Sequence, residues 1–441
     1  MHAKKSNATI AQIILLILAG ESVFILPFVL PRIFRPTFLD VFELTNFQLG
    51  GCFSIYGTVA LLSYLYGGAI ADKFSPRKLI AGSLFLTALG GLALSTFPSI
   101  GTLQLIYGYW GFTTIFLFWG AMIKATRVWG GTTKQGSAFG FLEGGRGFVA
   151  ATIGAIGVYI FSVILPSNIA TAMLVERQDA FRYVILFASG LAFIVGGLVF
   201  FFMDNSKKID TPIISSESSL ANIKKVLKIP SVWLLMLIVL SAYVGYKLTD
   251  VFSLYASEIM LFDEVKAAQI GTFQLYIRPI VCVAIGLMAD KSRGSLWITV
   301  GFIVMLSGAL IFATGLVQSG LNFLFFLSLI ITATGTYAIR TLYFAVLQEG
   351  KIPLAITGTA VGLISVVGYT PDIFIGPIMG YLLDSSPGIV GHQEVFMMLA
   401  LFSALGLIAS IRFSRLGVLK NMGVRYIPFK TRSYYRSRTR K

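Results

Sequence analysis

Charged residues are scarce in this chain of 441 residues. Asp, Glu, Lys and Arg make up 12% of it, whereas soluble globular domains carry about 25%. Hydrophobic residues make up 56%. A soluble fold of this size could not bury so much apolar surface, so lipid must solvate a large part of it. The composition therefore excludes a soluble enzyme or binding module and predicts a polytopic, all-α membrane protein.

Cysteine and histidine are also rare, with two residues of each type. Cys52 and Cys282 lie in apolar segments and indicate neither a disulfide framework nor a metal site. His2 and His392 are far apart in the sequence, at the terminus and in a loop, and predict no histidine cluster. We therefore expect no catalytic residue, no metal site and no cofactor.

Acidic residues are missing from the C-terminal end, where ten of the 35 Lys and Arg residues follow residue 411. A basic segment with tyrosines could bind RNA. A cytoplasmic tail that fixes topology and contacts anionic lipid is the preferred interpretation. We therefore expect a lipid bilayer, and no nucleic acid, as the partner of this tail.

Long apolar runs dominate the rest of the chain. A helix needs about 20 apolar residues to cross the hydrocarbon. Windows of that length predict twelve spans, near residues 10–31, 47–71, 78–97, 101–125, 138–164, 181–203, 231–257, 267–289, 296–317, 321–347, 356–383 and 392–413. We predict four units: an N-terminal six-helix bundle, a cytoplasmic linker, a C-terminal six-helix bundle and a basic cytoplasmic tail, over residues 1–203, 204–230, 231–413 and 414–441.

Charges in the predicted loops alternate between the two sides of the membrane. Basic residues follow the even-numbered spans and fill the central linker, whereas the opposite loops carry more acids. Arg32 and Arg35 are exceptions to this pattern. The positive-inside rule therefore places both termini in the cytoplasm. We expect the protein to lie in the inner membrane.

The two halves of the chain resemble each other at matched offsets of about 216–222 residues. GGAIADKFSPRK (67–78) corresponds to IGLMADKSRGS (285–295), GAMIKAT to TYAIRTL, and AFGFLEGGRG to AVGLISVVGY. Three motifs in the same register predict two pseudo-symmetric six-helix bundles. Internal repeats of this kind are typical of transporters.

The sequence resembles the major facilitator superfamily. The resemblance rests on GGAIADKFSPRK, its weaker copy, the twelve spans and the central polar linker. The stretch LTNFQLGGCFSIYGTVALLSYLYGGAIADKFSPRK is similar to the organophosphate and organic-anion branch, which includes glycerol-phosphate and hexuronate carriers. FWGAMIKATRVWGGTTKQGSAFGFLEGGRG is similar to a bacterial subgroup with proposed sugar or sulfonated-sugar substrates. The resemblance implies two bundles that rock around a central site and open alternately to each side.

Ionisable side chains deep in predicted spans are functional candidates, because a charge at the bilayer centre costs a few kcal/mol or more. The set comprises Glu21, Glu143, Arg146, Lys247, Asp250, Arg278 and Asp372. Glu143 and Arg146 are three residues apart and therefore share a helix face. Glycines 140, 144, 145 and 147 around them are expected to let a neighbouring helix approach closely.

Arg146 is the first candidate for substrate binding, because its planar fork suits a carboxylate, phosphate or sulfonate. By its spacing, the position matches a substrate-contacting histidine of the glycerol-phosphate carrier. Glu143 would then hold Arg146 in place or carry a coupling proton. The alternative is a salt bridge that only neutralises two costly charges.

Arg278 lies near the middle of its span and could be a second anion clamp or pair with an acid such as Asp372. Lys247 and Asp250 are again three residues apart, and Lys247 lies two residues from an arginine position of the family. The family's phosphate carriers place an arginine in the first span, where this chain has Glu21. A monoanionic or proton-coupled substrate is therefore favoured over a tightly held phosphate dianion.

Lys124 and Arg340 occupy equivalent places in the fourth and tenth spans, and snorkelling to the interface is the preferred explanation for both. Lys124 stays a substrate-site candidate because it matches an arginine of the organophosphate branch by spacing. Five aromatic residues are candidates for shaping the cavity: Tyr56, Trp119, Tyr246, Tyr276 and Tyr369.

The loop motif and its copy imply a gate, formed by Asp72, Arg77, Lys78, Arg127 and Asp290. Asp72 is expected to cap a facing helix or to pair with Arg127 when the inner side is closed. Proton coupling has three candidates, Glu21, Glu143 and Asp372, and the spacing does not choose between them.

The leading hypothesis is a secondary active transporter that moves a small organic anion with coupling to H+, and we expect it to be a monomer. The chain has no nucleotide-binding motif, because GGTTKQGSAFG lacks the order of a phosphate loop. Multidrug or metabolite efflux is the alternative within transport, and the deep basic residues argue against it. A non-transporting receptor or a membrane-embedded enzyme is the alternative of another class.

Overall fold

The structure of the chain is a computed structural model that describes residues 2–130, 135–166, 172–204, 219–353 and 357–421. These residues form helices and their connections and contain no strand. The all-α prediction is therefore confirmed.

Eleven helical segments of the described residues are long and apolar enough to cross a membrane. They run over Ile10–Ile33, Pro76–Leu94, Ile100–Thr126, Gly140–Ile164, Leu174–Phe202, Pro230–Glu258, Glu264–Ala289, Gly294–Ala313, Asn322–Leu342, Ala360–Ser385 and Ile389–Leu416. Helix α4 (Asn46–Lys73) has 28 residues, about 42 Å at 1.5 Å per residue. It occupies the place of the second predicted span and is long enough to cross.

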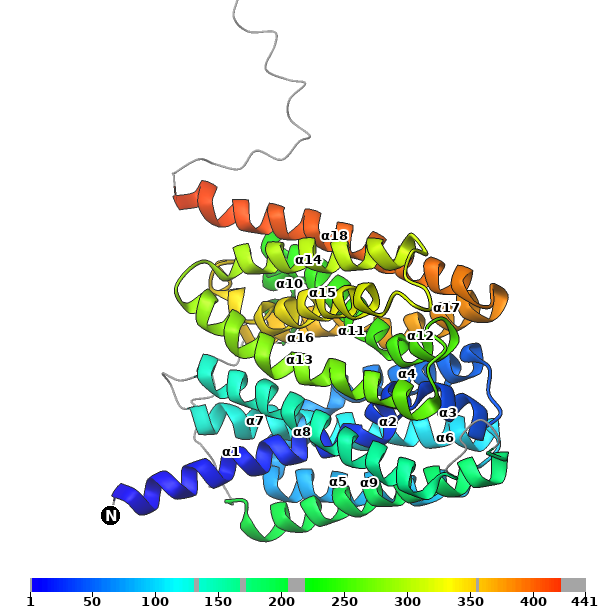
Figure 1. Ribbon diagram of the computed structural model, residues 1–441. Coiled ribbons are helices and arrows are strands. Elements are labelled where there is room, and N and C mark those ends of the chain that lie inside the picture. Colours follow the sequence, from blue (N-terminus) through cyan, green and yellow to red (C-terminus); the bar gives the residue numbers. More distant parts are fainter. Residues whose placement is uncertain (1, 131–134, 167–171, 205–218, 354–356, 422–441) are drawn as a thin grey trace, which may run out of the picture.

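The helices of the first half form one layer and those of the second half the other (Figure 1). The lower layer contains α1 (His2–Phe24), α2 (Leu30–Ile33), α3 (Arg35–Val41), α4, α5 (Pro76–Leu94), α6 (Ile100–Gly111), α7 (Gly120–Gly130), α8 (Gln135–Ile164) and α9 (Leu174–Phe202). The upper layer contains α11 (Pro230–Leu248), α12 (Phe252–Glu258), α13 (Glu264–Asp290), α14 (Gly294–Ala313), α15 (Asn322–Leu342), α16 (Thr357–Gly368), α17 (Pro371–Ser385) and α18 (Ile389–Asn421).

Each layer has its own hydrophobic core. One large cluster of buried residues joins the helices of the second half, and two clusters lie mostly in the first half. Residues 205–218 of the predicted linker lie outside the described part, and α10 (Ser219–Leu227) forms its end. The four-unit division of the chain stays a prediction.

Three spanning helices are interrupted near the middle of the molecule. A π-helical segment, η1 (Ile25–Val29), separates α1 from α2, and another, η2 (Phe112–Trp119), separates α6 from α7. A short 3-10 segment, η4 (Thr249–Val251), separates α11 from α12. π-helical turns are frequent at functional sites because they change the direction in which side chains point. These interruptions mark the level at which a central site is expected.

The two layers meet along two helix pairs, α4 with α17 and α8 with α13. In the first pair, a Cβ at Gly50 would collide with the backbone of Gly376, and a Cβ at Gly57 would lie 2.7 Å from the Asp372 carbonyl carbon. Only glycine therefore allows this approach.

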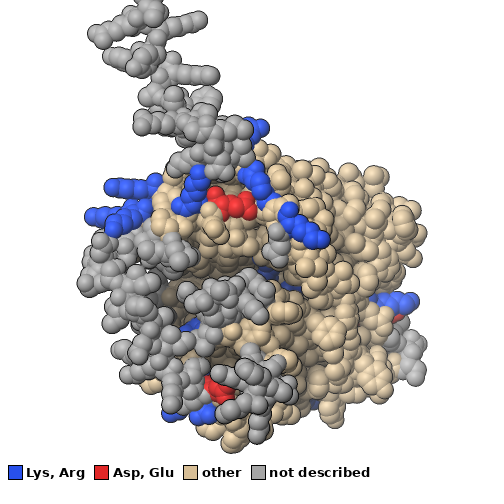
Figure 2. Space-filling view, turned by 90° about the vertical axis from the view of Figure 1, so that its left-hand side faces the viewer, with Lys and Arg blue, Asp and Glu red and all other residues tan. Residues whose placement is uncertain are grey.

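The chain enters α1 and leaves α18 at the same end of the molecule, here called the terminal end (Figure 1). Figure 2 shows this end with Lys and Arg side chains at its margins and a recess between the two layers. The other end, which carries α3 and the start of α4, is here called the opposite end.

Candidate functional site

A cavity of about 60 Å³ lies between the two layers. Residues of both halves line it: Glu21, Phe24, Phe28, Val29, Arg32, Tyr56, Tyr64, Ile115, Trp119, Arg146, Tyr243, Tyr246, Lys247, Arg340, Tyr369 and Asp372. Drug-sized ligands occupy cavities of about 300–1,000 Å³, so side chains must move when a substrate enters. Four of the lining residues are basic and two are acidic.

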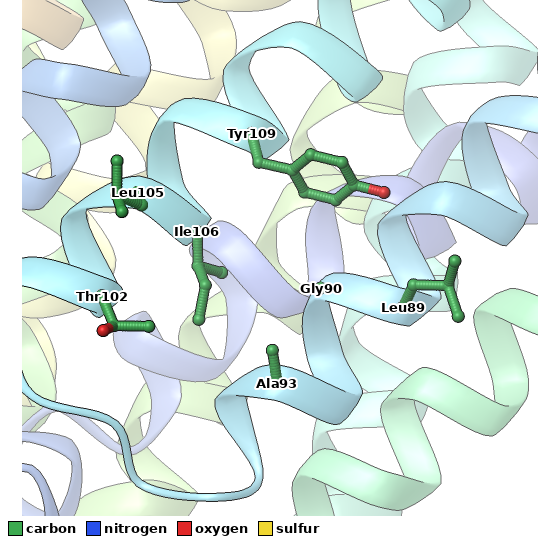
Figure 3. A pocket seen from close by; sticks show the side chains of 7 residues that line it. All are labelled: Leu89, Gly90, Ala93, Thr102, Leu105, Ile106 and Tyr109. Carbon is green, nitrogen blue, oxygen red and sulfur yellow. The ribbon is translucent and has the colours of Figure 1, made fainter.

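A larger depression lies between α5 and α6 and is lined by seven mainly apolar residues (Figure 3). Leu105 and Leu89 at its rim are 74% and 55% exposed. Both helices are predicted spans, so this surface faces lipid, and it offers no charged group to a ligand.

Glu143 joins arginines of both halves. Its Oε1 lies 2.6 Å from Arg146 Nη1 on the same helix, and its Oε2 lies 2.6 Å from Arg278 Nη2 on α13. Arg278 is 2% exposed and Glu143 is 29% exposed at the side chain. The predicted pair of Glu143 and Arg146 therefore exists, but the same carboxylate also bridges the two layers.

Glu21 completes this group from α1. Its Oε2 lies 3.2 Å from Arg146 Nε and 4.0 Å from Arg278 Nη1. Arg146 Nε also donates to the backbone oxygen of Gly20 at 3.0 Å. Glu21 and Glu143 therefore lie close to the same two arginines.

The four glycines near Glu143 differ in how closely a neighbouring helix approaches them. A Cβ at Gly147 would lie 3.0 Å from Arg278 Cδ, and a Cβ at Gly145 would lie 2.6 Å from Ile17. A Cβ at Gly140 or Gly144 would meet no atom within 4 Å among the described residues. The expected close approach is thus made at two of the four glycines, toward α13 and α1.

A second buried ion pair lies on the second-half wall of the cavity. Lys247 Nζ lies 3.3 Å from Asp372 Oδ1, and Tyr243 donates its hydroxyl to the same carboxylate at 3.1 Å. The Lys247 ammonium also lies 4.4 Å from the centre of the Phe28 ring. The suggested partner of Arg278 was therefore wrong, because Asp372 pairs with Lys247 while Arg278 pairs with Glu143.

A third pair joins the two halves toward the opposite end. Arg32 Nε lies 2.5 Å from Asp250 Oδ1, and both side chains are 1% exposed. Arg32 Nη1 donates to the Tyr246 hydroxyl at 2.9 Å, and Ser253 donates to the Arg32 backbone oxygen. Sequence reasoning left Arg32 in a loop and considered Asp250 only beside Lys247. The two residues are 218 positions apart, an offset within the range of the repeats, and this was the signal that could have revealed the pair.

Arg340 lies at the cavity, with its guanidinium carbon 3.7 Å from the centre of the Tyr246 ring. The preferred snorkelling explanation for Arg340 was therefore wrong, because its side chain is 14% exposed and turns inward. Lys124 does not line the cavity, and its ammonium donates to the Ala71 backbone oxygen at 2.9 Å. Distance along a helix gave the depth of these residues but not the face on which they lie.

Four of the five candidate aromatic residues line the cavity: Tyr56, Trp119, Tyr246 and Tyr369. Tyr276 does not line it and is 37% exposed. Tyr64 and Tyr243, which were not predicted, belong to the same wall. Their rings pack around Tyr369, with centroid distances of 6.2 and 4.8 Å.

The predicted gate residues lie partly outside the described part. The side chains of Asp72, Arg127 and Asp290 are not described, so their pairing stays a prediction. Lys78 is exposed, and the Arg77 guanidinium lies 5.8 Å from the centre of the Phe200 ring. The copy of the motif in the second half ends in a firmer contact, since Arg293 donates to the Ser414 backbone oxygen at 2.6 Å.

No group of three or more metal-ligating side chains occurs among the described residues. The cavity and its surroundings instead hold nine ionisable side chains in buried contacts: Arg32, Arg146, Lys247, Arg278, Arg340, Glu21, Glu143, Asp250 and Asp372. Five are basic and four are acidic, which leaves one positive charge without a matching acid. This arrangement suits the binding and release of a charged molecule.

Comparison with known proteins decides the family. The model of the major facilitator superfamily matches residues 13–371 of the chain. The chain belongs to the major facilitator superfamily. Members of this superfamily are transporters, so this multi-pass membrane protein is a transporter and not an enzyme.

Two similar proteins come from Escherichia coli strain K12. The inner membrane protein YqcE is 28% identical over 375 residues, covering 84% of this chain and 86% of YqcE. The inner membrane protein YihN is 27% identical over 406 residues, covering 90% of this chain and 93% of YihN.

Two solved structures share the major facilitator fold at low sequence identity. A bacterial homologue of the human lysosomal transporter Spinster, inward-facing and unoccupied, gives a TM-score of 0.70 at 14% identity, covering 96% of this chain and 98% of that one. A variant of the nucleoside transporter NupG gives 0.69 at 13% identity, covering 92% and 99%. These matches support the fold and carry no information about the substrate.

Proposed function

We propose that this transporter moves a small organic anion across the inner membrane by alternating access, coupled to protons. The observation that carries the proposal is the lining of the cavity, where four basic side chains face two acids. Arg146 and Arg340 offer planar guanidinium groups, which bind carboxylate, phosphate or sulfonate oxygens in pairs. This preference for an anion agrees with the proposed organic-anion branch of the superfamily.

The charge balance favours an anion. Five basic and four acidic side chains surround the site, so one negative charge on the substrate makes the occupied site neutral when all four acids are ionised, and two do so when Glu143 carries a proton. Neutrality matters because an uncompensated charge inside a membrane protein costs several kcal/mol. Export of apolar cations would instead require an excess of acids at the cavity.

We infer proton coupling because Arg146 and Arg278 both pair with Glu143. An anion that binds one of these arginines removes one ion-pair partner from the Glu143 carboxylate. A buried carboxylate without a partner is costly, and a proton removes its charge. Glu21 and Asp372 are alternative proton sites, because each lines the cavity beside a basic residue.

Two of the buried ion pairs that join the halves provide a gate on each side of the site. Arg32 and Asp250 close the opposite end, and Glu143 and Arg278 lie on the other side of the cavity. Both pairs are intact in this structure, and the cavity is small. We propose that opening to one side breaks one pair at a time, with the terminal end in the cytoplasm.

Transport by the purified protein in liposomes tests this proposal. The radiolabelled anions are D-glucuronate, D-glucose 6-phosphate, methanesulfonate and succinate, with methyl glucoside as a neutral control. We expect saturable uptake of at least one anion that accelerates when the outside is made acidic, and no uptake of the control. Uptake of lipophilic cations without uptake of any anion would contradict the proposal and favour efflux.

A further inference from the structure

Arg340 differs from the other arginines of the site in its hydrogen bonding. Its Nη1 is buried and has no hydrogen-bond partner among the described residues. Its Nη2 lies 4.0 Å from Glu143 Oε2, which is too far for a hydrogen bond. A buried donor without an acceptor is costly in free energy. An anion that accepted a hydrogen bond from Arg340 Nη1 would remove this cost.

The neighbouring arginines already donate hydrogen bonds to protein acceptors. Arg146 donates to Glu143 and to the Gly20 backbone, and Arg278 donates to Glu143. An anion that bound the nitrogen of either arginine that donates to Glu143 would first have to displace this carboxylate. Arg340 can accept an anion without breaking any hydrogen bond that the structure describes.

Tyr246 holds the Arg340 guanidinium in place. The guanidinium carbon lies 3.7 Å from the centre of the tyrosine ring, which is a favourable cation–π distance. The same tyrosine is fixed from the first half, because Arg32 donates to its hydroxyl and lies 4.4 Å from its ring centre. The aromatic ring binds the cation without occupying its N–H donors.

We propose that Arg340 is the residue that first receives the anionic group of the substrate, and that Tyr246 is the positioning residue that keeps its donors available. This inference rests on the anion transport proposed above and names the residue that recognises the charge. The anion then contacts Arg340 before Arg146, because Arg146 already donates hydrogen bonds to Glu143 and to the Gly20 backbone. Because Tyr246 also contacts Arg32, the same ring links the anion to the pair of Arg32 and Asp250 at the opposite end.

The first test needs no ligand. In the purified transporter, Arg340→Gln should lower the melting temperature less than Arg278→Gln does, because the Arg340 guanidinium has a ring contact with Tyr246 but no hydrogen bond to a described residue. Arg278→Gln is the matched variant and should lower the melting temperature, because it leaves Glu143 with one partner fewer. A loss in Arg340→Gln equal to that in Arg278→Gln would overturn the proposal, since Arg340 would then be a structural partner.

The second test measures binding of D-glucuronate, D-glucose 6-phosphate, methanesulfonate and succinate by thermal stabilisation. With the anion that stabilises the unmodified protein most, Arg340→Gln should weaken binding by about ten- to hundredfold, the range for lost hydrogen bonds to a charged group. Tyr246→Phe keeps the ring and should bind within about twofold of the unmodified protein, while Tyr246→Leu should bind more weakly. In liposome uptake, Tyr246→Leu should raise KM more than it lowers the maximal rate.

The outcomes separate the two proposals. Equal stabilisation of the unmodified protein and Arg340→Gln by an anion would overturn the role of Arg340 and leave anion transport standing. Equal binding by Tyr246→Leu and Tyr246→Phe would overturn the positioning role of Tyr246. If none of the four anions stabilises or enters with the unmodified protein, the proposed function fails, and this inference fails with it.

Discussion

Glu143 is an acid of the site that pairs with arginines of both halves. Its two oxygens each lie 2.6 Å from an arginine, one from each half of the chain. We predict that Glu143→Gln lowers the stability of the purified protein by about 3–5 kcal/mol, the usual loss when one partner of a buried ion pair is removed. Thermal unfolding in detergent measures this effect.

Asp179→Asn is the matched control for that substitution. Asp179 also pairs with an arginine three residues away, but both side chains are 41–50% exposed. Exposed pairs contribute about 0–1 kcal/mol. Similar losses in the two variants would show that the Glu143 contacts are not buried charge pairs.

Lys247 and Asp372 offer a second prediction, because their pair lies within one half. Lys247→Met leaves Asp372 buried with the Tyr243 hydroxyl as its described hydrogen-bond donor, so stability should fall by about 3–5 kcal/mol. Lys247→Met combined with Asp372→Asn removes both charges and should restore about half of that loss or more. A double-mutant cycle from chemical unfolding measures the coupling, and purely additive losses would contradict the pairing.

The sequence predicted the residues at the site better than their partners. Three-residue spacing on one helix was enough to predict the pair of Glu143 and Arg146. The acidic partners of Arg278 and Arg32 come from the other half of the chain. The rotation of each helix about its own axis decides which of its faces contacts the helix of the other half. That rotation depends on packing across the interface, which no single-helix pattern contains.

At the scale of helices, the approach of α4 to α17 depends on the absence of side chains. A Cβ at Gly50 would collide with the Gly376 backbone. We predict that Gly50→Val separates the two helices, lowers stability by about 1–3 kcal/mol as overpacking does, and slows transport. Gly82→Val is the control, because a Cβ at Gly82 meets no described atom within 4 Å.

Transport by the two glycine variants, divided by the amount of folded protein, is the measurement. Size-exclusion profiles of the purified variants give that amount. Equal transport by Gly50→Val and Gly82→Val would show that α4 and α17 need not touch during the cycle. The glycines of α4 were visible in the sequence, but their partner on α17 was not, because contact between distant helices is a tertiary property.

At the scale of the whole molecule, the apolar runs predicted the order of the spanning helices. They did so because lipid forces each span to satisfy its own backbone hydrogen bonds. The 60 Å³ cavity could not be predicted in this way. Its size depends on how the two layers sit against each other in one state of a cycle.

Topology provides the prediction at this scale. Both termini should lie in the cytoplasm, because basic residues gather at the terminal end. Green fluorescent protein fused after Lys441 should fluoresce, whereas alkaline phosphatase should be active only when inserted in loops of the opposite end, such as the turn at Gly320. Active phosphatase at the C-terminus would reverse the assignment.

The pair of Arg32 and Asp250 also says something about how such a chain arose. The two residues are 218 positions apart, at equivalent places in the two repeats. Two identical halves would set arginine against arginine, or aspartate against aspartate, at this buried contact. In a chain built from two copies of either half, these like charges would repel each other. After an ancestral duplication, this pair could therefore form only once the two copies had diverged, and neither half can now replace the other.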